Sequence, residues 1–434
     1  MPAKRVLILD TGKEWGGGTN SLLELLKRFV PEGSNRGIDT SKYHFTALFY
    51  NNYKKGNESD IKTEIEKLGI DFFILEQQGQ SFLSKMLKEI IRVLFFFGRR
   101  LKKYFIFLID YKFRIEPNAV KIAEILKSQN VNMLYMNNQP SSNLEGIIAG
   151  MALNLPCIQH SRVDVRLNKV EADAVNNCIS KVICVSNGVR DSLVSSGVLP
   201  EKCIVVYNGI DPDMKPITSA SAIKRMYGIN DNEILIGTVG SLIKRKRIND
   251  LIKALDKMQT QEGSVALYGQ RKSLGINPNV TTKMGQGGIK CMIVGDGTEK
   301  ENLQREVLRM GLQDRVIFTG FQTDAISYVN AMDIFVLPSE NEGLPRVILE
   351  AMLMAKPVVA YNVTGPSELV VDGETGFLVS VKETDMFANA LSKLVASDNL
   401  RRGMGEKGRM RVIERFAIDK YVNGVSNIFE EVLG

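Results

Sequence analysis

The sequence predicts an α/β protein of two domains, each built around a parallel β-sheet. Its 434 residues are about twice the length of an ordinary domain. Short β-branched, apolar runs alternate with stretches of helical periodicity, a pattern typical of βα units that form parallel sheets. Hydrophobic residues make up 44% and charged residues 24%. This composition is that of a water-soluble globular protein and excludes disordered, fibrous and multi-span membrane classes.

The expected strands fall into two sets. The first set covers residues 5–10, 44–50, 71–75, 132–137, 156–160, 181–186 and 203–208, and the second covers 233–240, 290–297, 316–321, 333–338 and 357–362. Between them, Gly209, Pro212 and Pro216 interrupt the chain after a strand and before a helical stretch. We therefore expect an N-terminal domain (1–207), a linker (208–216), a C-terminal domain (217–410) and a C-terminal helix (411–434) that could cross back to the N-terminal domain.

One connection is unusually long. About 30 residues, roughly 260–288, separate the helix expected at 249–258 from the strand that follows, and they are rich in Gly, Gln, Ser and Thr. Connections of this length are usually functional loops or insertions. We expect a mobile surface insertion and assign it no chemistry.

The cysteines and histidines restrict the compartment and the chemistry. The five cysteines contain no Cys-x-x-Cys pair, most lie in apolar runs, and there are only two histidines. A disulfide framework and a zinc centre are therefore not expected, and a reducing compartment fits. The start of the chain lacks the long apolar stretch of a signal peptide. We expect a cytoplasmic protein without a metal or cofactor, and we interpret Asp211 and Asp213 as capping residues of the linker.

The positive charge is concentrated between Ser81 and Arg114. This segment has nine basic and two acidic residues, so it accounts for the whole net charge of +7. Aromatic and aliphatic residues lie between the charges, and the uncharged stretches are far too short to span a bilayer. We expect the segment to contact an anionic membrane, at the inner face of the cell membrane. The alternative is an amphipathic helix that packs on its own domain, and nucleic acid is not expected because no binding motif accompanies the charge.

The most informative segment is 338–379. A strand ends, a loop carries Glu342, Pro345 is expected in the first turn of a helix, and that helix continues through Glu350. A helix N-terminus after a parallel strand is a phosphate site, here with the backbone N–H groups of Arg346 and Val347. Carboxylates near a phosphate would repel it. We therefore expect Glu342 and Glu350 to accept hydrogen bonds from sugar hydroxyls, as a sugar nucleotide requires.

This segment resembles the retaining glycosyltransferases of family 4, whose signature is Glu-x7-Glu followed by EAM and a PVVA strand. Further motifs match in order, namely EWGGGTNSLLELL (14–26), CIQHSR (157–162), ICVSNGVRD (183–191), VVYNGID (205–211) and TVGSLIKRKRINDLIKAL (238–255). The resemblance implies the GT-B fold, with two Rossmann-like domains whose parallel sheets face across a deep interdomain cleft. It implies acceptor binding mainly by the first domain, with Glu342 at the donor sugar and Glu350 at the nucleotide ribose.

The resemblance also implies a cationic site for the donor pyrophosphate. Lys246 aligns with the lysine of that site, but Ser241 stands where the family commonly has an arginine. Lys244 or Arg245 could supply the missing charge. A cation there would stabilise the leaving diphosphate without a metal.

The remaining candidates follow from the same resemblance. His160 would face the donor sugar near the reacting carbon, and its alternative is a core histidine. The glycines Gly16, Gly17 and Gly18 would let a loop approach a phosphate or the acceptor, and their alternative is a flexible turn. The donor-binding loops would add Gly240, Gly295, Phe321, Gly343 and Leu344, although VGDG (294–297) alone is also an ordinary strand-to-helix turn.

The resemblance implies a sugar transfer from a nucleoside diphosphate sugar to a saccharide or lipid-linked saccharide, in surface polysaccharide or glycolipid synthesis. For this family a front-face mechanism is commonly proposed, and the sequence shows no carboxylate nucleophile. A sugar-nucleotide epimerase or a phosphorylase of the same fold is an alternative. A catalytically silent glycan-binding or scaffold protein is another, suggested by Ser241.

Overall fold

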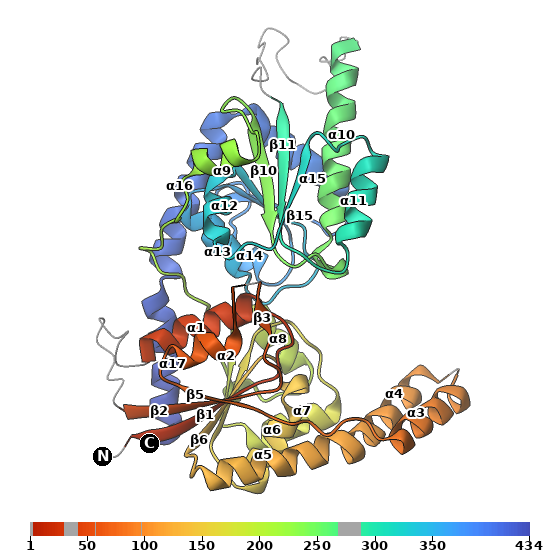
Figure 1. Ribbon diagram of the computed structural model, residues 1–434, viewed down its shortest axis with the longest axis vertical. Coiled ribbons are helices and arrows are strands. Elements are labelled where there is room, and N and C mark those ends of the chain that lie inside the picture. The colour runs from red at the N-terminus through yellow and green to blue at the C-terminus, as the bar shows by residue number, and fades with distance from the viewer. Residues whose placement is uncertain (1–2, 30–41, 57, 97, 268–287) are drawn as a thin grey trace. The chain divides into compact units, whose positions relative to one another are not determined.

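The computed structural model describes residues 3–29, 42–56, 58–96, 98–267 and 288–434. The chain forms two compact units (Figure 1): unit 1 comprises Met1–Val206 and Val422–Gly434, and unit 2 comprises Tyr207–Tyr421. Each unit is built around one large parallel sheet, which confirms the predicted α/β class. Residues 208–216, predicted as a linker, belong to unit 2.

The sheet of unit 1 has the strand order β5-β2-β1-β6-β7-β8-β9, and all its pairings are parallel. The central strand β1 is buried because its apolar run is covered on both faces. Parallel strands end at one common edge, so the polar residues that follow them gather there. The strands are β1 (Lys4–Asp10), β2 (Tyr43–Phe49), β5 (Asp71–Ile74), β6 (Met133–Asn137), β7 (Cys157–Ser161), β8 (Lys181–Cys184) and β9 (Cys203–Val205).

Helices cover both faces of this sheet (Figure 1). Helices α1 (Gly17–Phe29) and α2 (Ile61–Glu66) lie on one face, and α5 (Glu116–Ser128) and α6 (Leu144–Ala152) lie on the other. The unit also contains α7 (Lys169–Cys178), α8 (Asn187–Ser195) and a short antiparallel ribbon of β3 (Lys54–Lys55) and β4 (Ser59–Asp60).

The C-terminal part of the chain forms two helices, α16 (Asp398–Arg415) and α17 (Ile418–Leu433), with a break near residue 416 inside the predicted helix 411–434. From Val422 onwards α17 is part of unit 1. The buried ring of Phe429 packs against Phe29 and Tyr135, with centroid distances of 5.6 and 5.3 Å. The end of α17 therefore completes the aromatic core of unit 1.

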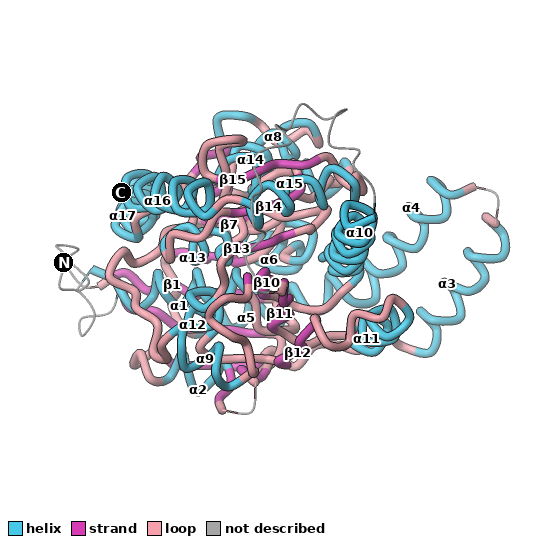
Figure 2. Tube along the Cα trace, turned by 90° about the horizontal axis from the view of Figure 1, so that it is seen from above, coloured by secondary structure: helices cyan, strands magenta, loops and turns pink. Residues whose placement is uncertain are grey.

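A helical hairpin extends from unit 1. Helix α3 (Phe82–Leu94) and helix α4 (Arg99–Asp110) lie side by side and stand away from the rest of the unit (Figures 1 and 2). A π-helical turn, Tyr111–Ile115, joins α4 to α5. Among the described residues, no helix is both long and apolar enough to cross a membrane.

The sheet of unit 2 has the order β12-β11-β10-β13-β14-β15 and is also parallel throughout. Helices α9, α12 and α13 cover one face, and α10, α11 and α15 cover the other (Figure 1). The strands are β10 (Ile234–Val239), β11 (Ile289–Val294), β12 (Val316–Gly320), β13 (Ile334–Leu337), β14 (Val358–Tyr361) and β15 (Gly376–Val379). The helices are α9 (Ala220–Met226), α10 (Ile248–Leu267), α11 (Lys300–Arg309), α12 (Ala325–Ala331), α13 (Arg346–Leu353), α14 (Pro366–Leu369) and α15 (Thr384–Ala396).

Two details of unit 2 differ from the expectation. The edge strand β15 is absent from the predicted set of strands. Helix α10 continues through Leu267, so the first residues of the predicted insertion 260–288 are helical. The prediction for residues 268–287 lies outside the described residues.

Candidate functional site

Backbone hydrogen bonds connect the loops at the carboxyl edge of the unit 2 sheet. The N–H of Gly240 donates to the carbonyl of Val294 at 2.9 Å, and the N–H of Gly295 donates to that of Gly320 at 2.8 Å. Gly295 has a φ of +140°, and a Cβ there would lie 2.0 Å from the carbonyl oxygen of Gly240. Only glycine fits this close approach of the two loops. The predicted residues Gly240 and Gly295 therefore lie next to each other at this edge, and Ser241 directly follows Gly240. Phe321 follows Gly320 and is exposed.

An ion-pair cluster lies at the same edge. The Nζ of Lys246 is 2.5 Å from Oε1 of Glu342, and the side chains are only 13% and 9% exposed. The Nη1 of Arg245 lies 4.0 Å from the same carboxylate oxygen and donates to the carbonyl of Asn341 at 3.0 Å. The structure thus brings together three predicted catalytic residues. Two cations face one carboxylate, so the cluster retains one positive charge for an anionic ligand.

Hydrogen bonds and ion pairs of Arg247 fix the loop that carries these cations. Arg247 has a left-handed backbone, with φ +49°. Its Nε donates to Oδ2 of the buried Asp250 at 2.7 Å, and the hydroxyl of Tyr361 donates to the same oxygen at 2.7 Å. Arg247 also contacts Glu340 at 3.3 Å. The sequence analysis did not identify this support, although Arg247 and Asp250 have the i,i+3 spacing of a helix-start pair.

Of the two candidates for the missing positive charge, the structure brings Arg245 to the cluster. Lys244 is exposed and lines an open depression of roughly 320 Å³ together with Arg247, Asn249 and Glu299. Lys244 and Arg245 are adjacent in a 3-10 turn, Lys244–Lys246, so their side chains point in different directions.

Helix α13 begins beside Glu342. Its first residue is Arg346, and Pro345 is the extended N-cap residue rather than a residue of the first turn as predicted. The backbone N–H groups of Arg346 and Val347 lie in the first turn, where a helix offers them no carbonyl partner. The preceding Leu344 is fixed through its carbonyl, which accepts from Nδ2 of Asn208 at 3.2 Å. The adjacent Gly343 is packed so tightly that a Cβ at Gly365 would lie 2.5 Å from its carbonyl oxygen.

Glu350 lies one turn along α13 and is paired with its own helix. Its Oε1 accepts from Nε of Arg346 at 3.1 Å, and both residues are buried. The Nη1 of Arg346 also donates to the carbonyl of Gly209 at 3.4 Å. The side chain of Arg346 thus fixes the carboxylate of Glu350, and the binding of a phosphate by the backbone of Arg346 stays a prediction. The role of Glu350 at a ribose stays a prediction.

In unit 1, the glycine loop leads into α1. The helix begins at Gly17, and the carbonyl of Gly16 accepts the N–H of Asn20 at 3.0 Å. A Cβ on Gly16 would have no described atom within 4 Å, and one on Gly18 would make an ordinary contact with Arg162 at 3.7 Å. Packing within the chain therefore does not require glycine at position 16. This leaves ligand approach or loop flexibility, the two readings that the sequence allowed.

A buried polar cluster beside this loop was missed by the sequence analysis. The carboxylate of Asp10 accepts from the N–H of Gly12 at 2.6 Å and from the amides of Asn137 and Asn138 at 2.6 and 3.0 Å. Nε of Arg162 donates to Oδ1 of Asn137 at 2.8 Å. Burial raises the pKa of Asp10, and the hydrogen bonds oppose this rise. The sequence signal was available, because these residues lie at or just beyond the ends of β1, β6 and β7.

His160 lies in the interior of unit 1. It is fully buried on β7, and its Nδ1 is 2.6 Å from the hydroxyl of Tyr135. Burial lowers the pKa of His160 well below its usual value, and the charge of Arg162 lowers it further. The imidazole is therefore neutral at pH 7, an arrangement typical of a core histidine. Its catalytic role stays a prediction.

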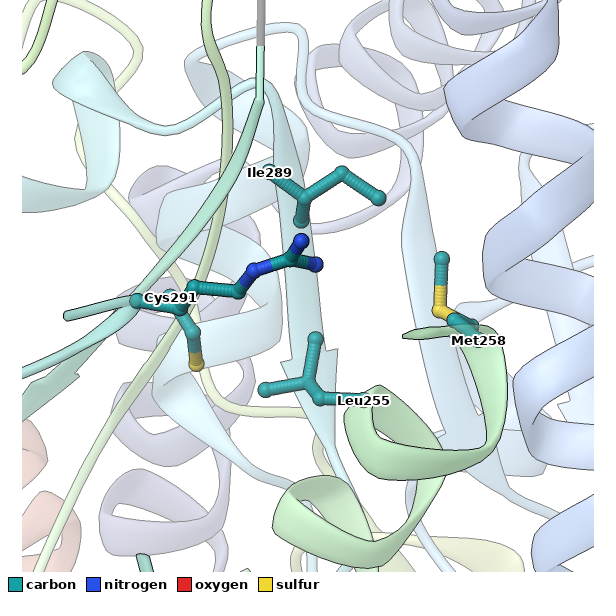
Figure 3. A pocket seen from close by; sticks show the side chains of 5 residues that line it. Leu255, Met258, Ile289 and Cys291 are labelled. Carbon is teal, nitrogen blue, oxygen red and sulfur yellow. The ribbon is translucent and has the colours of Figure 1, made fainter. Parts of the chain in front are cut away.

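A small internal cavity lies at the opposite edge of the unit 2 sheet (Figure 3). Its volume is about 10 Å³, and it is lined by Leu255, Met258, Ile289, Cys291 and Arg315. A volume of this size holds at most about one water molecule. It lies where β11 begins, whereas Glu342 follows the end of β13, so it is no part of the candidate site.

No group of three or more His, Cys, Asp or Glu residues within the described ranges is arranged to hold a metal ion. Asp211 accepts the backbone N–H of Asp213 at 2.9 Å, as in a local turn. This contact agrees with the capping role expected for the pair. A reaction without a metal or cofactor stays a prediction.

Two family models match the chain. The model described as "Glycosyl transferases group 1" matches residues 219–411, and "Glycosyltransferase Family 4" matches residues 62–214. An N-acetyl-alpha-D-glucosaminyl L-malate synthase of Bacillus anthracis is 27% identical over 326 residues, covering 73% of this chain and 78% of that protein. A UDP-Gal:alpha-D-GlcNAc-diphosphoundecaprenol alpha-1,3-galactosyltransferase of Escherichia coli is 25% identical over 331 residues, covering 73% and 79%.

Solved structures share the fold. HepE of Anabaena in complex with UDP and glucose aligns with a TM-score of 0.73 and 20% identity, covering 99% of this chain and all of that one. TarM of Staphylococcus aureus aligns with a TM-score of 0.68 and 14% identity, covering 98% of each chain. These similarities, with the two Rossmann-like sheets, confirm the predicted GT-B fold class.

Proposed function

The chain belongs to glycosyltransferase family 4, and from this premise we propose that it transfers a sugar from a nucleoside diphosphate sugar to a saccharide or lipid-linked saccharide. We further propose that the anomeric configuration is retained. The observation that carries this proposal is the cluster of Lys246, Arg245 and Glu342 at the carboxyl edge that also holds the N-terminus of α13. This edge of the sheet thus offers cations for the diphosphate of the donor and carboxylates for its hydroxyl groups.

The two parts of the donor would use different groups. The diphosphate is anionic, and we place it against the backbone N–H groups of Arg346 and Val347, where the helix dipole favours negative charge. Lys246 and Arg245 add charge-assisted hydrogen bonds to its oxygens. Glu342 and Glu350 would repel the phosphates, so they accept hydrogen bonds from hydroxyls of the sugar and the ribose.

In the proposed reaction, the acceptor hydroxyl oxygen attacks the anomeric carbon on the face from which the diphosphate departs. The bond from that carbon to the diphosphate oxygen breaks, and the acceptor proton passes to a departing phosphate oxygen. Negative charge grows on the diphosphate as it leaves. Lys246 and Arg245 are held in place beforehand and stabilise this charge.

Relatives support the class of substrate. The E. coli relative is named for a UDP-galactose donor and a diphosphoundecaprenol-linked acceptor. A capsular polysaccharide biosynthesis glycosyltransferase, CapM of Staphylococcus aureus, is 26% identical over 246 residues, which cover 55% of this chain and 58% of that protein. We therefore propose a role in surface polysaccharide or glycolipid synthesis, at the cytoplasmic face of the cell membrane, and uridine as the first nucleobase to test.

Thermal unfolding in the presence of UDP, GDP and ADP sugars tests the donor site. One nucleotide should raise the melting temperature of the wild type, and the rise should vanish in Glu350→Ala, measured against that variant's own baseline. Glu374→Ala is the matched control, because Glu374 is an exposed carboxylate of unit 2 outside the site and should leave the rise intact. No rise with any donor would instead favour the catalytically silent alternative. NMR of the product's anomeric proton tests retention, and inversion would refute that part of the proposal.

A further inference from the structure

The hairpin of residues 82–110 buries an ion pair and exposes many of its large apolar side chains. Its buried described residues are Ser84 and Lys88, and Nζ of Lys88 forms an ion pair with Asp110 across the two helices. Many of its large apolar side chains are exposed, including Phe82 (84%), Val93 (75%), Leu94 (70%) and Phe96 (70%). The rings of Phe95 and Phe105 stack between the helices with centroids 5.0 Å apart, whereas these exposed side chains face water. This arrangement indicates a partner that accepts apolar surface.

The exposed apolar side chains form one stripe on each helix. On α3 they recur at i, i+4, i+8 and i+11, and on α4 they recur at i, i+3 and i+7. The two stripes comprise Phe82, Met86, Ile90 and Val93 on α3, and Leu101, Tyr104 and Leu108 on α4. On α3, Ser84 and Lys88 lie on the side away from this stripe. On each helix the exposed apolar residues therefore form a continuous stripe and not a scatter of single residues.

The charge of the hairpin points to an anionic partner. Its two acidic residues are already engaged, Asp110 with Lys88 and Glu89 with Arg92. Three lysines, Lys85, Lys102 and Lys103, form no ion pair with any residue that the structure describes. Residues 81–114, which include the hairpin, account for the whole net charge of the chain. A second copy would therefore offer like charge against these lysines, whereas an anionic lipid headgroup offers the opposite charge.

We propose that the α3–α4 hairpin is a monotopic membrane anchor for an anionic lipid surface. The two apolar stripes enter the boundary between headgroups and acyl chains, the lysines lie among the headgroups, and the Lys88–Asp110 pair stays inside the hairpin. Helices of 13 and 12 residues are about 20 and 18 Å long. This is well short of the ~30 Å hydrocarbon core, so the hairpin stays in one leaflet.

The proposed anchor depends on the proposed function in one respect: it would hold the enzyme at the membrane, where lipid-linked acceptors occur. Lipid binding is independent of the donor. A failure of vesicle binding would therefore contradict the anchor alone. A failure of donor-induced thermal stabilisation would contradict the proposed function alone.

Sedimentation of the full chain with vesicles of equal phosphatidylcholine and phosphatidylglycerol tests the apolar stripe. Phe82→Ser with Val93→Ser should lower the partition coefficient by about 100-fold or more, because two large side chains no longer enter the acyl boundary. Both are exposed in the protein, so the fold should be unaffected. The matched control is Val120→Ser with Met151→Ser, two exposed apolar residues of unit 1 outside the hairpin, which should bind as the wild type.

The lysines are tested in the same assay. Lys85→Gln, Lys102→Gln and Lys103→Gln together should weaken binding to the mixed vesicles by about 100-fold, roughly fivefold per cation. Pure phosphatidylcholine should show little difference between this variant and the wild type. The matched control replaces Lys54, Lys127 and Lys169, three exposed lysines of unit 1 outside the hairpin, and should bind normally.

Two results would overturn the proposal. One is binding to mixed vesicles that is equal in the hairpin variants and their controls. The other is the absence of vesicle binding together with a dimer, detected by light scattering, that dissociates on Phe82→Ser with Val93→Ser. That result would assign the stripe to a second copy of the chain.

Discussion

Lys246→Met tests whether the buried ion pair with Glu342 supports the structure of unit 2 as well as its chemistry. The substitution keeps most of the apolar stem and removes the ammonium group. It leaves the Glu342 carboxylate buried, with Arg245 at 4.0 Å as its remaining cation. Removing one partner of a buried pair costs about 3–5 kcal/mol. Arg245 is 43% exposed, so solvent weakens its attraction and it compensates only in part.

We therefore expect Lys246→Met to lower the free energy of unfolding of unit 2 by about 2 kcal/mol. For a domain of its size, this corresponds to a decrease of roughly 4–8 °C in melting temperature. Combining it with Glu342→Gln removes both charges. The double variant should therefore be more stable than the sum of the single changes predicts, with a coupling of about 1–2 kcal/mol.

Calorimetry of the wild type, the two single variants and the double variant measures this coupling, and sugar transfer measures turnover. Turnover should fall about 10²- to 10³-fold with Lys246→Met, because a cation that faces the leaving diphosphate is lost. The double variant should recover stability without recovering turnover. Additive stabilities would refute the structural role of the pair, and recovered turnover would refute the role of Lys246 as a stabilising cation.

Three further outcomes are expected. Gly295→Ala should cost at least about 3 kcal/mol in urea unfolding and Gly320→Ala about 1, because both have positive φ but only Gly295 faces a backbone oxygen. A smaller difference would contradict the loop packing. Below about pH 6.5 the wild type should lose up to ~1.4 kcal/mol of stability per pH unit, because protonation of His160 favours the unfolded chain, and His160→Gln should flatten this slope. Asp110→Asn should make the hairpin at least about tenfold more sensitive to limited proteolysis, since Lys88 is left buried without its partner. Glu89→Gln breaks an exposed ion pair and should not change the sensitivity of the hairpin to proteolysis. Equal sensitivity of the two variants would contradict a stabilising role of the Lys88–Asp110 pair.

The parts of the fold that sequence patterns predicted are those set by local chemistry. The loop with Glu342 and the start of α13 were placed within one residue because strand, proline and helix follow one another closely. Strand β15 was missed because it is short and begins at Gly376. A Cβ there would lie 2.0 Å from the carbonyl of Val358 on β14, so the glycine is explained by a neighbour that the local sequence does not show.

The features that the sequence did not predict depend on contacts between residues far apart in the chain. Asp10 was read only as the end of a strand, because its partner Asn137 is 127 positions away. The amphipathic pattern of residues 81–114 predicted an apolar face. Whether that face packs on its own domain depends on tertiary structure, and the structure places the buried Lys88 on the opposite side.

The placement of Phe429 in the core of unit 1 affects how the chain is synthesised. Residues up to Val206 leave the ribosome early, but the aromatic cluster of Phe29 and Tyr135 lacks one of its rings until Phe429 has been made. At about 5–20 residues per second, this delay is roughly 10–45 s. The unit that is translated first therefore waits for the last helix of the chain to complete its core, and chaperones have this interval in which to bind it.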